Sequence, residues 1–208
     1  HVRVFGWNGT AWDQMGADLD GTISNGRYGS AIALSGNGAR LAVGATSGNS
    51  YQKGRVFVYE WNETAWLLMG AAFEDGNQRH GWSVSLNSDG SRLAIGDPDA
   101  EPVGVGGPLS NAGWVKIFEW NGTAWAQMGA HLQYDTNTSN VYFGHSISLS
   151  AAGDRIAVGA GGAGADSNGQ VRIFAWNGTV WGQVGPTIYG EEHDDYFGGG
   201  TLSFGVGT

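Results

Sequence analysis

A hexapeptide that recurs four times constrains the fold of this chain more than any other feature. It is Trp-Asn-Gly-Thr-Ala-Trp with two small variations, and its copies span residues 7–12, 61–66, 120–125 and 176–181. Copies of one motif that recur every 50 to 60 residues, between segments that also resemble one another, indicate one structural unit repeated along the chain.

Three other landmarks recur in the same order between the copies. A ring-bearing residue precedes glycine at 28–29, 80–81, 143–144 and 197–198, an Arg-Leu-Ala-Val-Gly-like segment spans 40–44, 92–96 and 155–159, and a Val-rich segment precedes the second, third and fourth hexapeptides. The sequence between landmarks alternates with a period of two and is broken by Asn-Gly and Asp-Gly turns, which is typical of antiparallel hairpins. Each unit is therefore predicted to form four antiparallel strands.

This pattern predicts an all-β fold, a β-propeller of four-stranded antiparallel blades. Both faces of the segment Val56–Tyr59 are bulky and apolar, as expected for a sheet packed between two neighbours. Residues 1–208 are predicted to form a single propeller segment, with whole units at 25–69, 78–128 and 141–184 and partial units at 1–16 and 196–208. That is a little under four blades, so we expect a partial ring, or a ring completed by a second copy or by further sequence.

Composition excludes several classes of function. The net charge of −9 opposes binding to nucleic acid, and no run of Lys or Arg suits an anionic membrane. No apolar stretch approaches the roughly 20 residues that cross a bilayer, and the absence of cysteine removes disulfides and thiolate metal sites. No nucleophile elbow or phosphate loop is present, so we expect no enzyme activity and no cofactor.

The landmarks together resemble the FG-GAP repeat family, the propeller repeats of integrin α-subunit heads and of many secreted proteins. The resemblance rests on Phe143-Gly144 before Ser146–Leu149, on Ile156–Ala160 and on Gly169–Phe174. It implies a secreted or cell-surface protein. Many family members have a calcium loop between the first two strands, but the corresponding segments 35–38, 87–90 and 150–153 hold at most one carboxylate. Calcium prefers six to eight oxygen ligands, so we expect no metal site there.

Every hexapeptide is also an N-glycosylation sequon, with Asn8, Asn62, Asn121 and Asn177 at predicted turn tips, and Asn137 begins a fifth sequon. We expect glycosylation at these five asparagines. The alternative is that Asn-Gly is present only because it suits a tight turn. The paired tryptophans have two interpretations as well: ring contacts that stabilise the hairpin, which we favour, or platforms for sugars.

Two segments stand apart from the repeat. The longest predicted loop, 97–112, carries Asp97, Asp99 and Glu101, which are candidate binding residues because long loops on a rigid scaffold often bind ligands. The segment Glu191–Asp195 is the densest charge cluster. We expect it to be a solvated loop between blades, although its carboxylates could also coordinate a hard cation.

These observations predict an extracellular glycoprotein that acts as a non-catalytic adhesion, matrix or assembly module. The expected partner is a protein or a glycan, or other copies of the chain or the rest of a larger propeller. Two rivals remain open. The first is a propeller lectin that uses its tryptophans, and the second is a polysaccharide-acting enzyme with carboxylates contributed by different blades.

Overall fold

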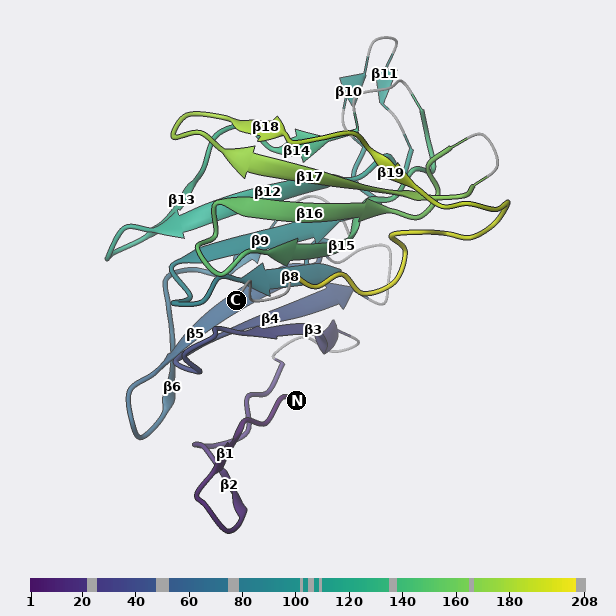
Figure 1. Cartoon of the computed structure of the whole chain (residues 1–208). Helices are drawn as coiled ribbons and strands as arrows, with labels where there is room; N and C mark the ends of the chain where they lie inside the picture. Colours follow the sequence, from purple (N-terminus) through teal and green to yellow (C-terminus); the bar gives the residue numbers. More distant parts are fainter. Residues whose placement is uncertain are drawn as a thin grey trace.

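The computed structural model describes residues 1–21, 26–47, 53–74, 79–101, 103–104, 107–108, 110–134, 138–164 and 167–204. These residues form strands, turns and bends, and among them no helix is long and apolar enough to cross a membrane. Three sheets are stacked in chain order, with the N-terminal hairpin at one end of the stack and the third sheet at the other (Figure 1).

Each sheet has four antiparallel strands in sequence order and a fifth, short strand beside the third. The first sheet contains β3 (Gly26–Leu34), β4 (Arg40–Ser47), β5 (Arg55–Trp61), β6 (Trp66–Leu68) and β7 (Phe73–Glu74). The second contains β8 (Ser83–Leu86), β9 (Arg92–Asp97), β12 (Trp114–Trp120), β13 (Trp125–Gln127) and β14 (Leu132–Gln133). The third contains β15 (Phe143–Leu149), β16 (Arg155–Ala160), β17 (Gln170–Trp176), β18 (Trp181–Gln183) and β19 (Ile188–Tyr189).

Two hairpins complete the described structure. One, β1 (Phe5–Trp7) and β2 (Trp12–Gln14), corresponds to the last two strands of a unit, and the other, β10 (Val103–Gly104) and β11 (Gly107–Pro108), lies in the long loop. The predicted all-β class and the four-stranded antiparallel blades are confirmed. The strands β7, β14, β19, β10 and β11 were not expected. The strand expected near the C-terminus does not form in residues 197–204, where the only pairing is a bridge between Phe197 and Gly169.

Hydrophobic side chains fill the space between successive sheets. Val56 and Val58 of the first sheet pack with Leu93 and Ile95 of the second, and a larger cluster around Phe143 joins the second sheet to the third. The N-terminal hairpin covers the outer face of the first sheet in the same way. Each buried aliphatic side chain contributes roughly 1.5–3 kcal/mol, so the stacking of sheets stabilises the fold.

Glycines at the repeated landmarks allow this close stacking. Gly96 at the end of the Arg-Leu-Ala-Ile-Gly segment lies against the carbonyl oxygen of Gly144 in the next unit, and a Cβ on Gly96 would overlap that oxygen. Ser83 Oγ donates a hydrogen bond of 2.8 Å to the same carbonyl. Gly44 and Gly159 approach the next unit in the same manner. The recurrence of these glycines therefore follows from the packing between sheets.

The tryptophan pairs join neighbouring units. Within each hexapeptide the two rings lie 5.3–5.5 Å apart across the hairpin. The second tryptophan then donates its indole N–H to a methionine carbonyl of the preceding unit, at 3.0 Å for Trp66 to Met15, 3.2 Å for Trp125 to Met69 and 3.1 Å for Trp181 to Met128. The structural interpretation of these tryptophans is confirmed, and it extends from one hairpin to the contact between sheets.

Candidate functional site

One position of the repeat supplies three residues to a single cavity at the loop end of the stack. Arg79, Tyr142 and Tyr196 each stand immediately before the ring-bearing residue and glycine of successive units. All three line a cavity of about 450 Å³, together with His145, Asp195 and glycines at 161, 162, 199 and 200. The volume lies within the roughly 300–1,000 Å³ that is typical of small-ligand sites. We call this site the loop-end cavity.

A chain of contacts holds the polar side chains of the loop-end cavity in place. The Nε of Arg79 lies 2.9 Å from Oδ2 of Asp99, and its guanidinium carbon lies 4.7 Å from the centre of the Trp82 ring. That ring in turn lies 5.2 Å from the imidazole of His145, which is on β15, the first strand of the third sheet. The second and third sheets therefore build one wall together.

Burial sets the charge state of this wall. It lowers the pKa of His145, with the positive charge of Arg79 acting in the same direction, while a hydrogen bond to the Gly199 backbone and the carboxylate of Asp99 act against it. The imidazole is therefore neutral near pH 7. Burial also raises the pKa of Asp99, against the opposing charges of Arg79 and His145. His145 therefore adds no positive charge to this wall, in which Arg79 and Asp99 form an ion pair.

The backbone around the cavity is held in an unusual conformation. Tyr142 and Tyr196 have φ values of 56° and 48°, in the left-handed region that side chains other than glycine rarely adopt. Such a residue costs about 1–2 kcal/mol. Hydrogen bonds offset the cost: Tyr142 N donates to Asn111 O at 2.9 Å, and Asp195 Oδ2 accepts from the backbone N–H groups of Glu191 and Glu192. These hydrogen bonds hold the backbone of Tyr142 and of the turn before Tyr196.

A groove continues from the loop-end cavity along β3, β8 and β15, the first strands of the three sheets. It shares His145, Gly199 and Gly200 with the cavity, and it has a volume of about 380 Å³. Ile32 of β3, Val84 of β8 and Ile147 of β15 line it, so all three sheets contribute. A ligand larger than the cavity could extend along this groove.

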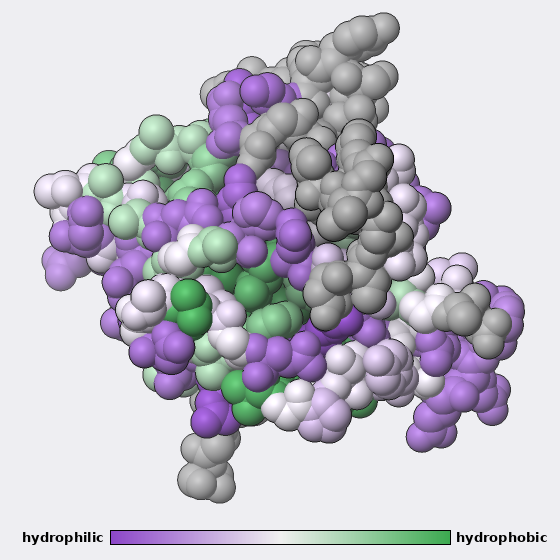
Figure 2. All heavy atoms as spheres, turned by 90° about the horizontal axis from the view of Figure 1, so that it is seen from above, coloured by the Kyte–Doolittle hydropathy of each residue, from purple (hydrophilic) through white to green (hydrophobic). Residues whose placement is uncertain are grey.

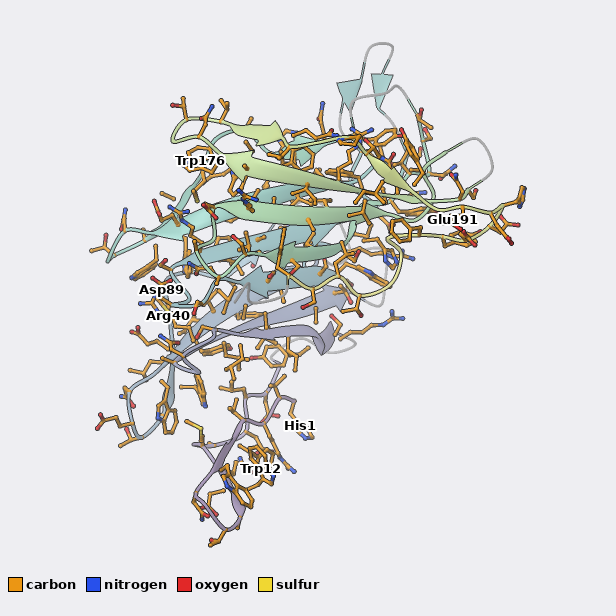
Figure 3. All side chains as sticks on the ribbon, in the orientation of Figure 1. His1, Trp12, Arg40, Asp89, Trp176 and Glu191 are labelled. Atoms are coloured by element: carbon orange, nitrogen blue, oxygen red, sulfur yellow. The ribbon has the colours of Figure 1, made fainter. Side chains whose placement is uncertain are left out.

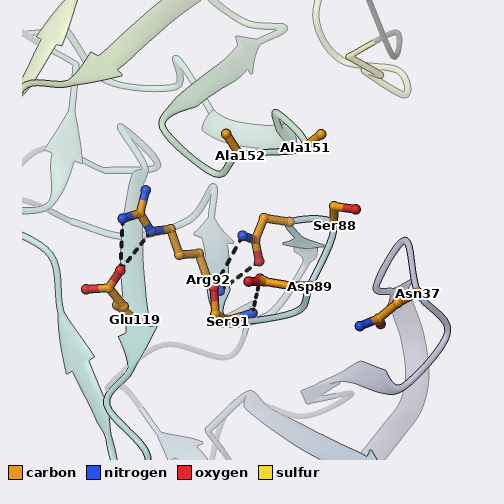
Figure 4. A pocket seen from close by; sticks show the side chains of 9 residues that line it. Asn37, Ser88, Asp89, Ser91, Arg92, Glu119, Ala151 and Ala152 are labelled. Atoms are coloured by element: carbon orange, nitrogen blue, oxygen red, sulfur yellow. Dashed lines mark hydrogen bonds and ion pairs between the residues drawn. The ribbon is translucent and has the colours of Figure 1, made fainter.

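A second hollow, of about 430 Å³, lies at the opposite end, between the turns that join the first and second strands (Figure 4). Its polar side chains are engaged with one another: Arg92 donates to Glu119 at 2.9 and 3.0 Å, and Asp89 accepts from Ser91 N at 2.8 Å. The hydrogen bonds from Ser91 lower the pKa of Asp89. This arrangement braces the turns, and no group of three or more His, Cys, Asp or Glu that could hold a metal occurs among the described residues.

One of the three predicted binding residues, Asp99, contacts a residue that lines the loop-end cavity. Asp99 anchors Arg79, as described above. Glu101 is exposed, and Asp97 is fully buried at the end of β9. A binding role for Asp97, Asp99 and Glu101 stays a prediction. The charged segment Glu191–Asp195 is exposed to solvent, and within it only Asp195 lines the cavity.

The four repeated sequons lie at exposed hairpin tips, as expected. Each asparagine closes its own turn, because its Oδ1 accepts hydrogen bonds from the backbone two and three residues later, for example at 3.0 Å from Thr123 and 2.9 Å from Ala124 for Asn121. Each of these asparagines therefore closes its turn through its side chain and is also the first residue of a sequon: Asn8, Asn62, Asn121 and Asn177. Asn137 lies outside the described residues.

Sequence inspection did not single out Arg79, Tyr142, His145 or Tyr196 as site residues. No local motif marks them, since they are separated by up to 117 residues (from 79 to 196) and meet only because the sheets stack. Alignment of the repeats by their ring-bearing residue and glycine could have found them. It places Arg79, Tyr142 and Tyr196 at the same position of successive units.

No family model matches the sequence, and no curated protein matches it. Among solved structures, a eukaryotic initiation factor is similar at 8% identity and a TM-score of 0.50, over 90% of this chain and 44% of that chain. TolB from Acinetobacter baumannii and an acylaminoacyl peptidase from Pyrococcus horikoshii each have 12% identity and a TM-score of 0.43, over 85% and 86% of this chain. This chain matches 35% of the TolB chain and 27% of the peptidase chain, so it spans less than half the length of all three. At such low identity the similarity shows the fold alone: an all-β array of antiparallel sheets like those of β-propeller domains.

Proposed function

We propose that this chain is a non-catalytic recognition module, part of a secreted or cell-surface β-propeller of the FG-GAP type. In this proposal it holds a protein or glycan ligand in the loop-end cavity and serves adhesion, matrix or assembly. One observation carries the proposal: the same repeat position, occupied by Arg79, Tyr142 and Tyr196, supplies three of the residues that line one cavity. Rigid scaffolds that present loop residues are a common design for binding.

The lining of the cavity favours a ligand that has both an apolar face and hydrogen-bonding groups. Tyr142 and Tyr196 offer aromatic rings with hydroxyl groups, and the guanidinium of Arg79 offers hydrogen-bond donors. A sugar ring or a polar peptide side chain has both features.

The rival functions have less support. The sugar-platform interpretation requires free tryptophan faces, but three of the four pairs contact the preceding unit through Trp66, Trp125 and Trp181. The exposed pair Trp7 and Trp12 is the one that this interpretation could use. An acid–base mechanism requires two available carboxyl groups, whereas Asp99 is paired with Arg79 and Asp195 accepts two backbone N–H groups. Because both carboxylates already have hydrogen-bond or ion-pair partners within the chain, the cavity favours binding over acid–base catalysis.

Binding of the labelled chain to a glycan array and to immobilised extracellular-matrix proteins tests the proposal. The variant Tyr196→Ala should weaken binding about tenfold, which corresponds to roughly 1.4 kcal/mol. Tyr189→Ala is the matched control, because Tyr189 and Tyr196 are 57% and 56% exposed but Tyr189 does not line the cavity. Equal binding by both variants, or no binding to any probe, would contradict the proposal.

The compartment has a separate test. We expect at least two of the four repeated sequons to carry sugar in protein from its native source. Intact mass measured before and after enzymatic deglycosylation reports this directly. An unchanged mass would contradict glycosylation, but it would not bear on the proposed binding site.

A further inference from the structure

One tryptophan hairpin departs from the other three just after its second tryptophan. In the first sheet the next two residues are Leu67 and Leu68. The other copies have glutamine at the second of these positions: Asp13-Gln14, Ala126-Gln127 and Gly182-Gln183. Each glutamine donates its side-chain N–H to the carbonyl of the glycine two residues later, at 3.1, 2.9 and 3.2 Å in chain order. Leu68 has no such donor, so the Gly70 carbonyl lacks this hydrogen bond.

Both leucines are exposed to solvent because of their position in the repeat. Leu67 is 52% exposed and Leu68 is 49% exposed. The corresponding Ala126 and Gln127 are exposed as well, although they belong to the second sheet, which packs on a neighbour at each face. Exposure is therefore a property of this position, and a further sheet at either end of the stack would not change it.

Other apolar side chains are exposed for a different reason. Figure 2 looks down on the third sheet, the last of the stack, and hydrophobic residues occupy the middle of that face. Exposure there follows from the place of the sheet in the stack, so it does not indicate a partner. An apolar pair at a position that carries a polar side chain in every other copy is a stronger indication of a contact surface.

The two leucines lie on an edge strand. β6 (Trp66–Leu68) pairs with β5 on one side, and no described strand pairs with its other side. The backbone groups along that side can therefore pair with another strand. Consecutive residues of a strand point to opposite faces of the sheet, so a flat surface could cover Leu67 or Leu68 but not both. An added strand would place side chains beside both leucines.

The same edge is acidic. Glu63, at the tip of the hairpin, is exposed and forms no ion pair with any described residue. It has a φ of 76° where the other copies have glycine, so a carboxylate is present here despite the backbone strain. Glu60 lies opposite Leu67 in β5, and its half-exposed carboxylate is 2.9 Å from Arg40. These charges favour Lys or Arg in a strand that approaches the edge.

We propose that β6 is a docking edge for an extended segment of another protein, which adds to the first sheet as a strand. The segment has apolar side chains beside Leu67 and Leu68 and a Lys or Arg near Glu63. A second copy of this chain is a poor occupant, because each copy carries a net charge of −9 and both edges would be acidic.

The docking edge is separate from the loop-end cavity. Arg40, which holds Glu60, lies at the same end of the sheets as Trp176, whereas Glu191, beside the cavity, lies at the opposite end (Figure 3). Binding at the edge can therefore be measured independently of the proposed function.

Fluorescence polarisation with labelled peptides tests the proposal on the full chain. The probe is Lys-Thr-Val-Val-Thr-Lys with blocked termini, because β-branched residues favour an extended strand. One peptide should bind per chain. Glu-Thr-Val-Val-Thr-Glu should bind about tenfold more weakly at low salt, and added salt should reduce the difference. Lys-Thr-Pro-Pro-Thr-Lys should also bind about tenfold more weakly, because proline cannot donate to a sheet.

Two sets of substitutions are matched to the repeat. Leu67→Asp with Leu68→Gln installs the residues of the first copy and should weaken binding of the basic peptide about tenfold. Gly122→Glu with Ala126→Leu and Gln127→Leu installs the apolar, acidic edge in the second sheet and should raise the stoichiometry from one peptide to two. All five positions are exposed, and the thermal midpoint of each variant shows whether the fold is retained.

Three outcomes would overturn the proposal. The first is a parent chain that does not bind the basic peptide at its highest soluble concentration. The second is unchanged affinity after Leu67→Asp with Leu68→Gln; if that variant does not fold, a stoichiometry that stays at one in the second-sheet variant decides instead. The third is a different occupant, seen as a dimer in sedimentation velocity or as binding to phosphatidylcholine vesicles that these two substitutions abolish.

Discussion

At the scale of single residues, the tips of the tryptophan hairpins show how one substitution changes a repeat. The second turn residue is glycine in three copies, with φ values of 102°, 100° and 98° at Gly9, Gly122 and Gly178. The remaining copy places Glu63 there at 76°. A side chain in this region costs roughly 1–2 kcal/mol, because its Cβ crowds the neighbouring carbonyl.

The variant Glu63→Gly should therefore stabilise the fold by about 0.5–1 kcal/mol, after allowance for the greater freedom of glycine in the unfolded chain. Equilibrium denaturation measures the change. The reverse substitution, Gly122→Glu, is a matched control, because a Cβ at Gly122 meets no atom within 4 Å and only the backbone conformation opposes it. It should destabilise by a similar amount. A loss of stability in Glu63→Gly would show that the glutamate makes a compensating contact.

His145 predicts a dependence of stability on pH. Burial lowers its pKa in the folded chain. When the pH falls below the ordinary histidine value of about 6.5, the unfolded chain takes up a proton that the folded chain does not, so stability decreases. Above that value the contribution is constant. His145→Gln should flatten the acid limb of a plot of unfolding free energy against pH, and an unchanged limb would contradict the prediction.

At the scale of elements, the indole bonds between units are the most direct test of how the sheets are joined. Trp181→Phe keeps a ring but removes the bond of 3.1 Å to Met128 O. Loss of one buried hydrogen bond should cost about 1–3 kcal/mol. Trp12→Phe at the exposed pair should change the unfolding free energy by less than about 0.5 kcal/mol. Equal effects of the two substitutions would show that the bond between units contributes nothing.

The elements divide into those that local sequence determines and those that it does not. The hairpins could be predicted because Asn-Gly turns and alternating apolar residues act within a few positions, and β8 (Ser83–Leu86) has such an alternation. The two-residue strand β14 (Leu132–Gln133) carries no periodic signal. The Gly-rich segment near the C-terminus matches the start of a unit, but it forms no strand in residues 197–204. Its Gly198–Gly200 run has no side chains to pack on the third sheet.

The loop-end cavity is among the features that local sequence does not determine. Arg79 and His145 meet through Trp82 because two sheets stack at a fixed spacing, and no spacing in the sequence encodes that distance. The conformation of Tyr142 was also beyond prediction, because a positive φ at a tyrosine opposes its local preference and persists only through surrounding bonds.

At the scale of the whole molecule, the sheets form a one-dimensional series in which each packs only on its neighbours. The described clusters join the N-terminal hairpin to the first sheet, the first sheet to the second, and the second to the third. In such a series, stability is approximately a sum of units and nearest-neighbour contacts, and the ends open before the middle. The second sheet has neighbours on both faces and should be the last to open.

Hydrogen exchange in dilute solution should therefore be slowest in β9 and fastest, among the described strands, in β1 and β2. The variant Trp66→Phe sharpens the test. It removes the bond to Met15 O that fastens the N-terminal hairpin to the first sheet, so exchange should accelerate within residues 2–19 and remain unchanged in the second and third sheets. Acceleration throughout the chain would mean that the stack unfolds as one cooperative body, and the nearest-neighbour description would then be wrong.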